Sequence, residues 1–210
     1  MSERTDQRLV RGARTRRMIA RHAVDVASLE GLNGLSFGRL AAELGLSKSG
    51  VQTLFVTKES LQLAAVEAAR EAFVDAVVRP AQGVPHGVAR LRALVDNWIA
   101  YAGAPLFPGG CFWVANLADF DNRPGPVHDA LFERQEGWLS LIAAELRHAA
   151  DAGEITEVDA DLAAFQIDAV LCAANIAFRL GDENVEEKVR QVIDGLVVPG
   201  VDLQRNRFLR

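Results

Sequence analysis

Three helix starts of the same design follow one another closely between residues 35 and 61. Ser36, Ser47 and Thr57 are residue types that cap helix N-termini, and each has an apolar residue directly before it and another four residues after it. The starts lie eleven and ten residues apart, so the first two helices have room for only about two turns each. Helices this short are stable only when they pack against one another. The expected apolar pairs are Leu35 with Leu40, Leu46 with Val51, and Val56 with Leu61.

A glycine stands where the first short helix must end and the chain must reverse. Gly45 adopts a positive φ at no steric cost, so the pattern predicts a helix-turn-helix. On the second short helix, Val51, Leu54 and Phe55 have the spacing of one face and are expected to pack inward. The side chains left pointing outward are short and polar, namely Lys48, Ser49, Gln52 and Thr53.

Helical spacing of apolar residues continues along the rest of the chain, and no segment shows the sustained alternation of a strand. We therefore predict an all-α protein of about nine helices. Besides the two short helices, they are expected near residues 14–29, 57–79, 84–102, 111–120, 127–151, 159–180 and 183–198. The predicted domains are a helix-turn-helix domain over 1–58, with a flexible basic arm at 1–12, a helical domain over 59–199, and a tail at 200–210.

The charges are distributed unevenly along the chain. Residues 1–60 hold ten Lys or Arg and six Asp or Glu, whereas the remaining residues carry the excess of acid that brings the net charge to −5. A basic end on an acidic chain favours a polyanionic partner for that end, although a solvated leader would look the same. The two cysteines, the lack of an apolar leader after the basic start and the lack of a membrane-spanning run predict a cytoplasmic protein.

Residues 14–61 resemble the N-terminal DNA-binding domain of the tetracycline-repressor (TetR) family of bacterial transcriptional regulators. The resemblance rests on the arginine-rich first helix ending at Gly31, on "LAAELGLS" across the turn, and on Phe55, Lys58 and Leu61 with their spacing. Two positions depart from the family pattern. Gln52 stands where the family usually has an aromatic residue that touches a phosphate, and Gly50 where a small hydroxyl residue is common.

The chemistry of the outward face agrees with what this resemblance implies. A helix fits the major groove of B-DNA, and Lys48 and Gln52 can form hydrogen bonds that distinguish guanine and adenine edges. Helix N-termini and basic side chains can bind phosphate oxygens, and Arg16 could add a further contact to the DNA. Caps and solvated charges would explain several of these residues without DNA. The predicted DNA-binding residues are Arg14, Arg17, Ser36, Arg39, Ser47, Lys48, Ser49, Gln52, Thr53 and Lys58.

One helix-turn-helix reads only a few base pairs, so a homodimer on a palindromic double-stranded operator is expected. The helix predicted over 159–180 is apolar on more than one face and must be covered on both sides. In the resembled family this helix and the one that follows form a four-helix bundle with their dimer mates. The alternative is that both helices belong to the core of a monomer.

Aromatic residues gather in the middle of the chain, and most of them should be core. In the resembled family the corresponding helices surround a small-molecule effector that alters the spacing of the DNA-reading heads, and a largely apolar or aromatic effector is expected here. The predicted ligand-binding residues are Trp98, Tyr101, Phe107, Cys111, Trp113, Asn116, Phe120, Trp138, Phe165, Asp168 and Cys172.

Other functions are less well supported by the sequence. Cys111 at a helix start could be a reactive thiol in a redox or electrophile sensor, although a small buried cysteine is the simpler reading. The four histidines lack metal-ligand spacing, and no phosphate-binding loop or nucleophile motif is present, so we expect no enzyme activity, metal or cofactor. An architectural DNA binder that responds to no ligand remains an alternative.

Overall fold

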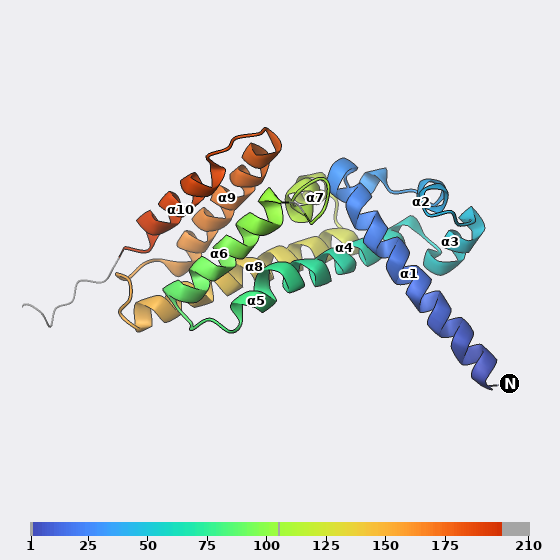
Figure 1. Ribbon diagram of the computed structural model, residues 1–210, viewed down its shortest axis with the longest axis horizontal. Helices are drawn as coiled ribbons and strands as arrows, with labels where there is room; N and C mark the ends of the chain where they lie inside the picture. Colours follow the sequence, from blue (N-terminus) through green and yellow to red (C-terminus); the bar gives the residue numbers. More distant parts are fainter. Residues whose placement is uncertain (1, 105, 199–210) are drawn as a thin grey trace, which may run out of the picture. The chain divides into compact units, whose positions relative to one another are not determined.

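The computed structural model describes residues 2–104 and 106–198, and these residues form helices joined by short connections (Figure 1). Within these ranges no strand is present, so the predicted all-α fold class is confirmed. The predicted tail at 200–210 lies outside the described residues. The elements are α1 (Ser2–Glu30), η1 (Leu32–Gly34), α2 (Phe37–Glu43), α3 (Lys48–Phe55), α4 (Lys58–Phe73), η2 (Val74–Val78), α5 (Arg79–Ala81), α6 (Val88–Gly103), α7 (Phe112–Phe120), α8 (Pro126–Asp151), α9 (Ala160–Arg179) and α10 (Val185–Leu196).

The chain divides into two compact units that interleave along the sequence. Unit 1 comprises Met1–Val74 and Ala104–Gln135, and unit 2 comprises Asp75–Gly103 and Glu136–Arg210. Unit 1 therefore holds α1 to α4 together with α7 and the start of α8. The domain boundary after residue 58 stays a prediction, but these units show that a distant segment packs with the helix-turn-helix.

The three predicted helix caps in unit 1 are all present. The side chains of Ser36, Ser47 and Thr57 each accept a hydrogen bond from the backbone N–H three residues later, at 3.1–3.2 Å. Gly45 has φ +64°, as the predicted turn between α2 and α3 requires. Local sequence therefore determines where these helices begin.

One of the three predicted apolar pairs is wrong. Leu61 is completely buried, but Val56 is 73% exposed and does not pack as its partner. The cause is the backbone, because Val56 has φ +62° and ψ −57° and turns its side chain outward.

Helix α1 begins at Ser2 and not near Arg14, so the backbone of the arm expected at 2–12 is helical. No capping residue or Pro marks a start at residue 14, and Arg, Gln and Leu favour continuation of a helix. The predicted inward face is confirmed, since Ile19, Ala23 and Val26 are buried.

In unit 2, α6 begins at Val88, four residues later than predicted, because two carboxylates cap its first turn. Glu145, on α8 and only 2% exposed, accepts hydrogen bonds from Gly87 N at 3.0 Å and His86 Nδ1 at 2.9 Å. Glu154 accepts one from Val88 N at 2.8 Å. Acceptors at a helix N-terminus satisfy amide groups that have no partner within the helix.

The remaining helices lie close to their predicted ranges. The helix predicted over 57–79 is realised as α4, the π-helical turn η2 and α5, which follow one another without a break. In unit 2, α9 and α10 lie side by side (Figure 1).

Candidate nucleic-acid interface

Helix α3 presents a polar face to solvent and is fixed by buried anchors behind it. Val51 and Phe55 are each 1% exposed. Ser47 caps the first turn through Gly50 N. All four side chains predicted to point outward are exposed, namely Lys48, Ser49, Gln52 and Thr53. The helix therefore displays hydrogen-bonding groups from a firmly held backbone.

The two hydroxyl side chains of this face already have local partners. Thr53 Oγ1 donates to Ser49 O at 2.8 Å, and Ser49 Oγ lies 3.4 Å from Ser47 Oγ. A hydroxyl oxygen that donates can still accept, so both groups keep capacity for a further hydrogen bond. Lys48 and Gln52 are the longer exposed side chains and reach furthest from the helix.

Arg16 holds the C-terminal end of α3 from α1. Its Nε donates to Leu54 O at 3.4 Å, and its guanidinium lies 4.8 Å from the centre of the Phe55 ring. A cation is favourable at the carbonyl end of a helix and over an aromatic face. All three arginines Arg14, Arg16 and Arg17 are exposed, and Arg16 in addition positions the helix. The contacts join residues 38 and 39 positions apart, so sequence spacing could not reveal this role.

Arg39, predicted to bind phosphate, forms ion pairs in the structure. Its guanidinium bonds to Glu30, at the end of α1, and its Nε donates to Glu43 Oε1 at 2.8 Å. These hydrogen bonds lower the pKa of both carboxyl groups and raise the pKa of Arg39. Glu43 also lies 2.7 Å from His22 Nε2. A phosphate would have to compete with two carboxylates for this side chain.

Lys58 has a structural partner as well. Its Nζ donates to Asn33 O at 2.5 Å and joins the start of α4 to η1. An ammonium group has three N–H donors, so a phosphate contact by Lys58 stays compatible with this bond. Every residue of the predicted DNA-binding set is exposed except Arg39, which is partly buried. Ser36 and Ser47 also cap helices, and Arg39 and Lys58 also link one element to another.

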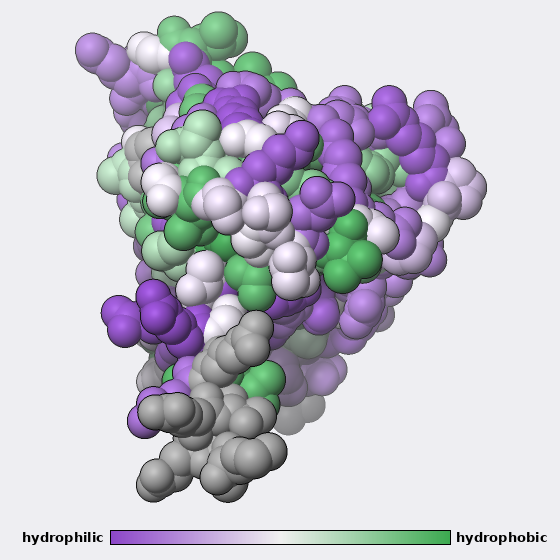
Figure 2. All heavy atoms as spheres, turned by 90° about the vertical axis from the view of Figure 1, so that its right-hand side faces the viewer, coloured by the Kyte–Doolittle hydropathy of each residue, from purple (hydrophilic) through white to green (hydrophobic). Residues whose placement is uncertain are grey.

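The surface near α3 has two open hollows. One of about 460 Å³ is lined by Ser49, Gln52, Thr53 and Val56. The other, of about 800 Å³, lies between α3 and the first half of α1, where Gly12, Ala13 and Gly50 leave room. Figure 2 shows the right-hand side of Figure 1, where hydrophilic residues predominate and hydrophobic ones form small groups.

The residues predicted to bind an effector are divided between the two units. Phe107, Cys111, Trp113, Asn116 and Phe120 belong to unit 1, and the others belong to unit 2. Most of these side chains are buried, as core residues are. Phe165 is 63% exposed, and Asp168 and Cys172 lie one turn apart with 3.9 Å between Sγ and Oδ2.

Asn116 has a structural role that the sequence did not reveal. It is completely buried, and its Oδ1 accepts from Leu32 N at 2.6 Å while its Nδ2 donates to Ala27 O and Phe112 O. The side chain thus joins α7 to the end of α1 within unit 1. Its Nδ2 donates two hydrogen bonds within unit 1, and its role in effector binding stays a prediction.

Cys111 is the residue before the first turn of α7 and is only 2% exposed. Oxidants reach exposed thiolates far more readily than buried thiols, so the structure does not favour the sensor function. Among the residues described, no group of three or more His, Cys, Asp or Glu side chains is arranged to hold a metal ion.

An exposed apolar stripe runs the length of α9. Leu162, Phe165, Ile176 and Leu180 are each more than half exposed and fall on one helical face. Helix α9 is also long and apolar enough to cross a membrane by length and composition, which for one helix is weak evidence. A helix covered by a second protein surface has the same composition.

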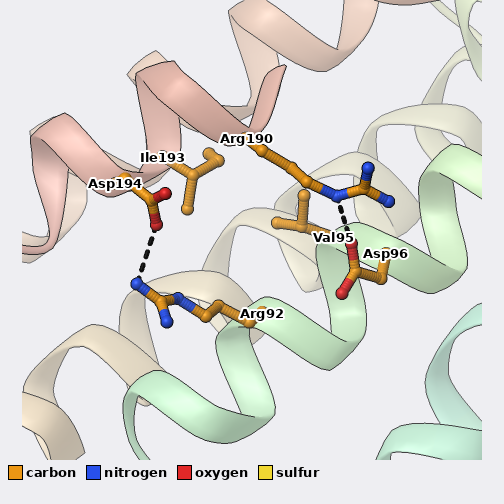
Figure 3. A pocket seen from close by; sticks show the side chains of 6 residues that line it. All are labelled: Arg92, Val95, Asp96, Arg190, Ile193 and Asp194. Atoms are coloured by element: carbon orange, nitrogen blue, oxygen red, sulfur yellow. Dashed lines mark hydrogen bonds and ion pairs between the residues drawn. The ribbon is translucent and has the colours of Figure 1, made fainter. Parts of the chain in front are cut away.

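Two ion pairs join α10 to α6 (Figure 3). Arg92 Nη2 lies 2.7 Å from Asp194 Oδ1, and Arg190 Nε lies 3.1 Å from Asp96 Oδ1. Both pairs are about half exposed, so each contributes little to stability.

A family model described as "Tetracyclin repressor-like, C-terminal domain" matches residues 87–193, which is just over half of the chain. The chain belongs to the TetR family. This match lies in the C-terminal half of the chain, whereas the resemblance seen in the sequence lay in the first quarter. No curated protein matches the chain by sequence.

Solved structures of TetR regulators have the same fold. A TetR transcriptional regulator from Chloroflexus aurantiacus is 26% identical, with a TM-score of 0.78 over 87% of this chain and 96% of that one. AibR, solved with isovaleryl coenzyme A and operator DNA, is 20% identical, with a TM-score of 0.72 over 88% and 98%. A regulator from Saccharomonospora viridis in complex with choline is 17% identical, with a TM-score of 0.71 over 88% and 96%.

Proposed function

We propose that this TetR-family chain acts in the cytoplasm as a homodimeric, non-enzymatic repressor that binds a palindromic DNA operator and is released by a small-molecule effector. The observation that carries the proposal is the outward polar face of α3, which is fixed by Val51, Phe55, Ser47 and Arg16. A rigid helix with Lys48 and Gln52 exposed suits base edges in the major groove.

The DNA-binding test begins with selection of a preferred sequence from random duplexes, followed by fluorescence anisotropy from 50 to 200 mM salt. We expect specific binding that weakens as salt rises, because basic side chains displace counterions from phosphate. Lys48→Ala should lose roughly five- to hundredfold in affinity if Lys48 reads a base. Lys188→Ala on α10 is the matched control and should bind as the wild type does.

The outcomes separate the proposed function from its alternatives. Equal binding to all sequences would support an architectural DNA binder instead. Absence of binding at 50 mM salt would reject a DNA role for α3. Specific binding that no small molecule releases would reject the ligand-responsive part of the proposal alone.

The exposed stripe on α9 supports dimerisation, since an apolar face of this length is stable in water only when covered. We expect a mass of about twice 22.8 kDa in sedimentation equilibrium. Combining Phe165→Glu with Ile176→Glu should give monomers, because four carboxylates would face one another across the interface. Phe132→Glu, at a partly exposed phenylalanine on α8, is the control and should leave the dimer intact. A monomeric wild type would contradict the proposal.

An effector is supported by the solved complexes of two relatives, one with isovaleryl coenzyme A and one with choline. Reciprocal coupling would let an effector that prefers one dimer geometry lower the affinity for DNA, typically by 5- to 150-fold. The aromatic residues predicted from the sequence suggest a largely apolar or aromatic molecule. A screen for compounds that release the selected duplex tests this part directly.

A further inference from the structure

Val56, directly after α3, has a backbone conformation that its side chain disfavours. Its φ of +62° is the only positive value at a non-glycine position among the residues that the structure describes. Thr57 N donates to Phe55 O at 2.6 Å, which closes a three-residue turn around Val56. A β-branched side chain is strained in such a turn, whereas glycine would fit without strain.

The fold of unit 1 gives no reason to keep valine at this position. The side chain is 73% exposed, and Leu61 is buried without its help. Strained residues persist where function requires them, so the side chain of Val56 calls for a functional explanation.

The position of Val56 suggests what its side chain contacts. It lines the same open hollow as Ser49, Gln52 and Thr53, the exposed polar residues of α3. An isopropyl group forms no hydrogen bonds, and its χ1 angle is restricted, so it presents methyl groups in a fixed direction. Such a side chain has no donor to offer a phosphate oxygen. An apolar group on a base is therefore a better partner for Val56 than a phosphate.

We propose that Val56 contacts the C5-methyl group of a thymine in the operator and so contributes to base recognition. This methyl group is the apolar feature of the major groove, and it is absent from the other bases. The inference rests on the proposed function, since it requires that α3 lies in the major groove of a specific operator.

The test replaces each thymine of the selected operator, one at a time, by deoxyuridine, which lacks only this methyl group. With the wild type, one position in each half-site should lose affinity by about fourfold, the effect of one buried methyl group. Val56→Gly removes the contact from both protomers, so affinity for the thymine operator should fall by about fourfold for each half-site, and that position should no longer distinguish thymine from deoxyuridine. Val56→Thr keeps one methyl group and the branched shape, and should retain the discrimination.

Each result bears on the inference separately from the proposed function. If no operator is selected, the proposed function fails. If an operator is found but no deoxyuridine changes the affinity of the wild type, the role of Val56 is rejected while DNA binding stands. If the Val56→Gly variant still prefers thymine to deoxyuridine as strongly as the wild type does, the role of Val56 is also rejected. Because relief of strain offsets the flexibility of glycine, Val56→Gly should unfold in urea no earlier than the wild type. The replacement of thymines by deoxyuridine is measured with the wild-type protein, so this part of the test does not depend on whether a variant folds.

Discussion

Replacing Asn116 by leucine is expected to lower the free energy of unfolding by about 3 kcal/mol. Leucine has a similar volume, but it leaves Leu32 N–H buried without the acceptor that Asn116 Oδ1 provides at 2.6 Å. Ala27 O and Phe112 O also lose a donor. Urea unfolding followed by circular dichroism measures the change.

The matched control is Asn122→Leu, in the exposed turn after α7. A surface substitution of this kind changes stability by no more than about 0.5 kcal/mol. Equal losses for the two variants would show that the hydrogen bonds of Asn116 are not what stabilises unit 1. Asn116→Asp keeps an acceptor but places a completely buried carboxylate against Ala27 O and Phe112 O, so it should be at least as destabilising as leucine.

Gly109→Ala is expected to destabilise unit 1 by about 3 kcal/mol or more. A Cβ at this position would lie 1.9 Å from Ser28 O and 2.1 Å from Ser28 C, and both are backbone atoms that no rotamer change can move. The segment would have to shift away from α1 and stretch the 2.9 Å bond from Gly109 N to Ser28 Oγ. Urea unfolding again gives the magnitude.

Gly137→Ala is the opposite case and serves as the control. Gly137 lies inside α8, is exposed, and has nothing within 4 Å of an added Cβ. Alanine is the better helix former by about 1 kcal/mol, so this variant should gain stability. A loss at Gly137, or no loss at Gly109, would contradict the close packing of the segment after residue 104 against α1.

What could be predicted from the sequence was local. A cap and its acceptor lie three residues apart, so Ser36, Ser47 and Thr57 mark their helices correctly. The inward and outward faces of α3 follow from the helical period in the same way. The pair of Val56 and Leu61 was wrong because a positive φ at valine is disfavoured and has no sequence signal.

The roles that escaped prediction depend on contacts between distant residues. Asn116 bonds to an amide 84 positions away, and Gly109 packs on a backbone 81 positions away. The ion pair of Arg39 with Glu30 requires knowledge of how α1 and α2 lie together, whereas its pair with Glu43 is a local i, i+4 pair within α2. A single sequence identifies the polar residues, but it does not show which of them come into contact in the folded protein.

The interleaving of the two units has a consequence for synthesis of the protein. The ribosome adds roughly 5 to 20 residues per second, so the segment holding Gly109 and Asn116 emerges several seconds after α4. Until then Leu32 N–H has no buried acceptor, and Phe107 cannot yet cover its part of α1. Unit 1 thus completes its packing only after part of unit 2 has been made, and a nascent chain paused near residue 100 would expose the unfinished core of unit 1 to chaperones and proteases.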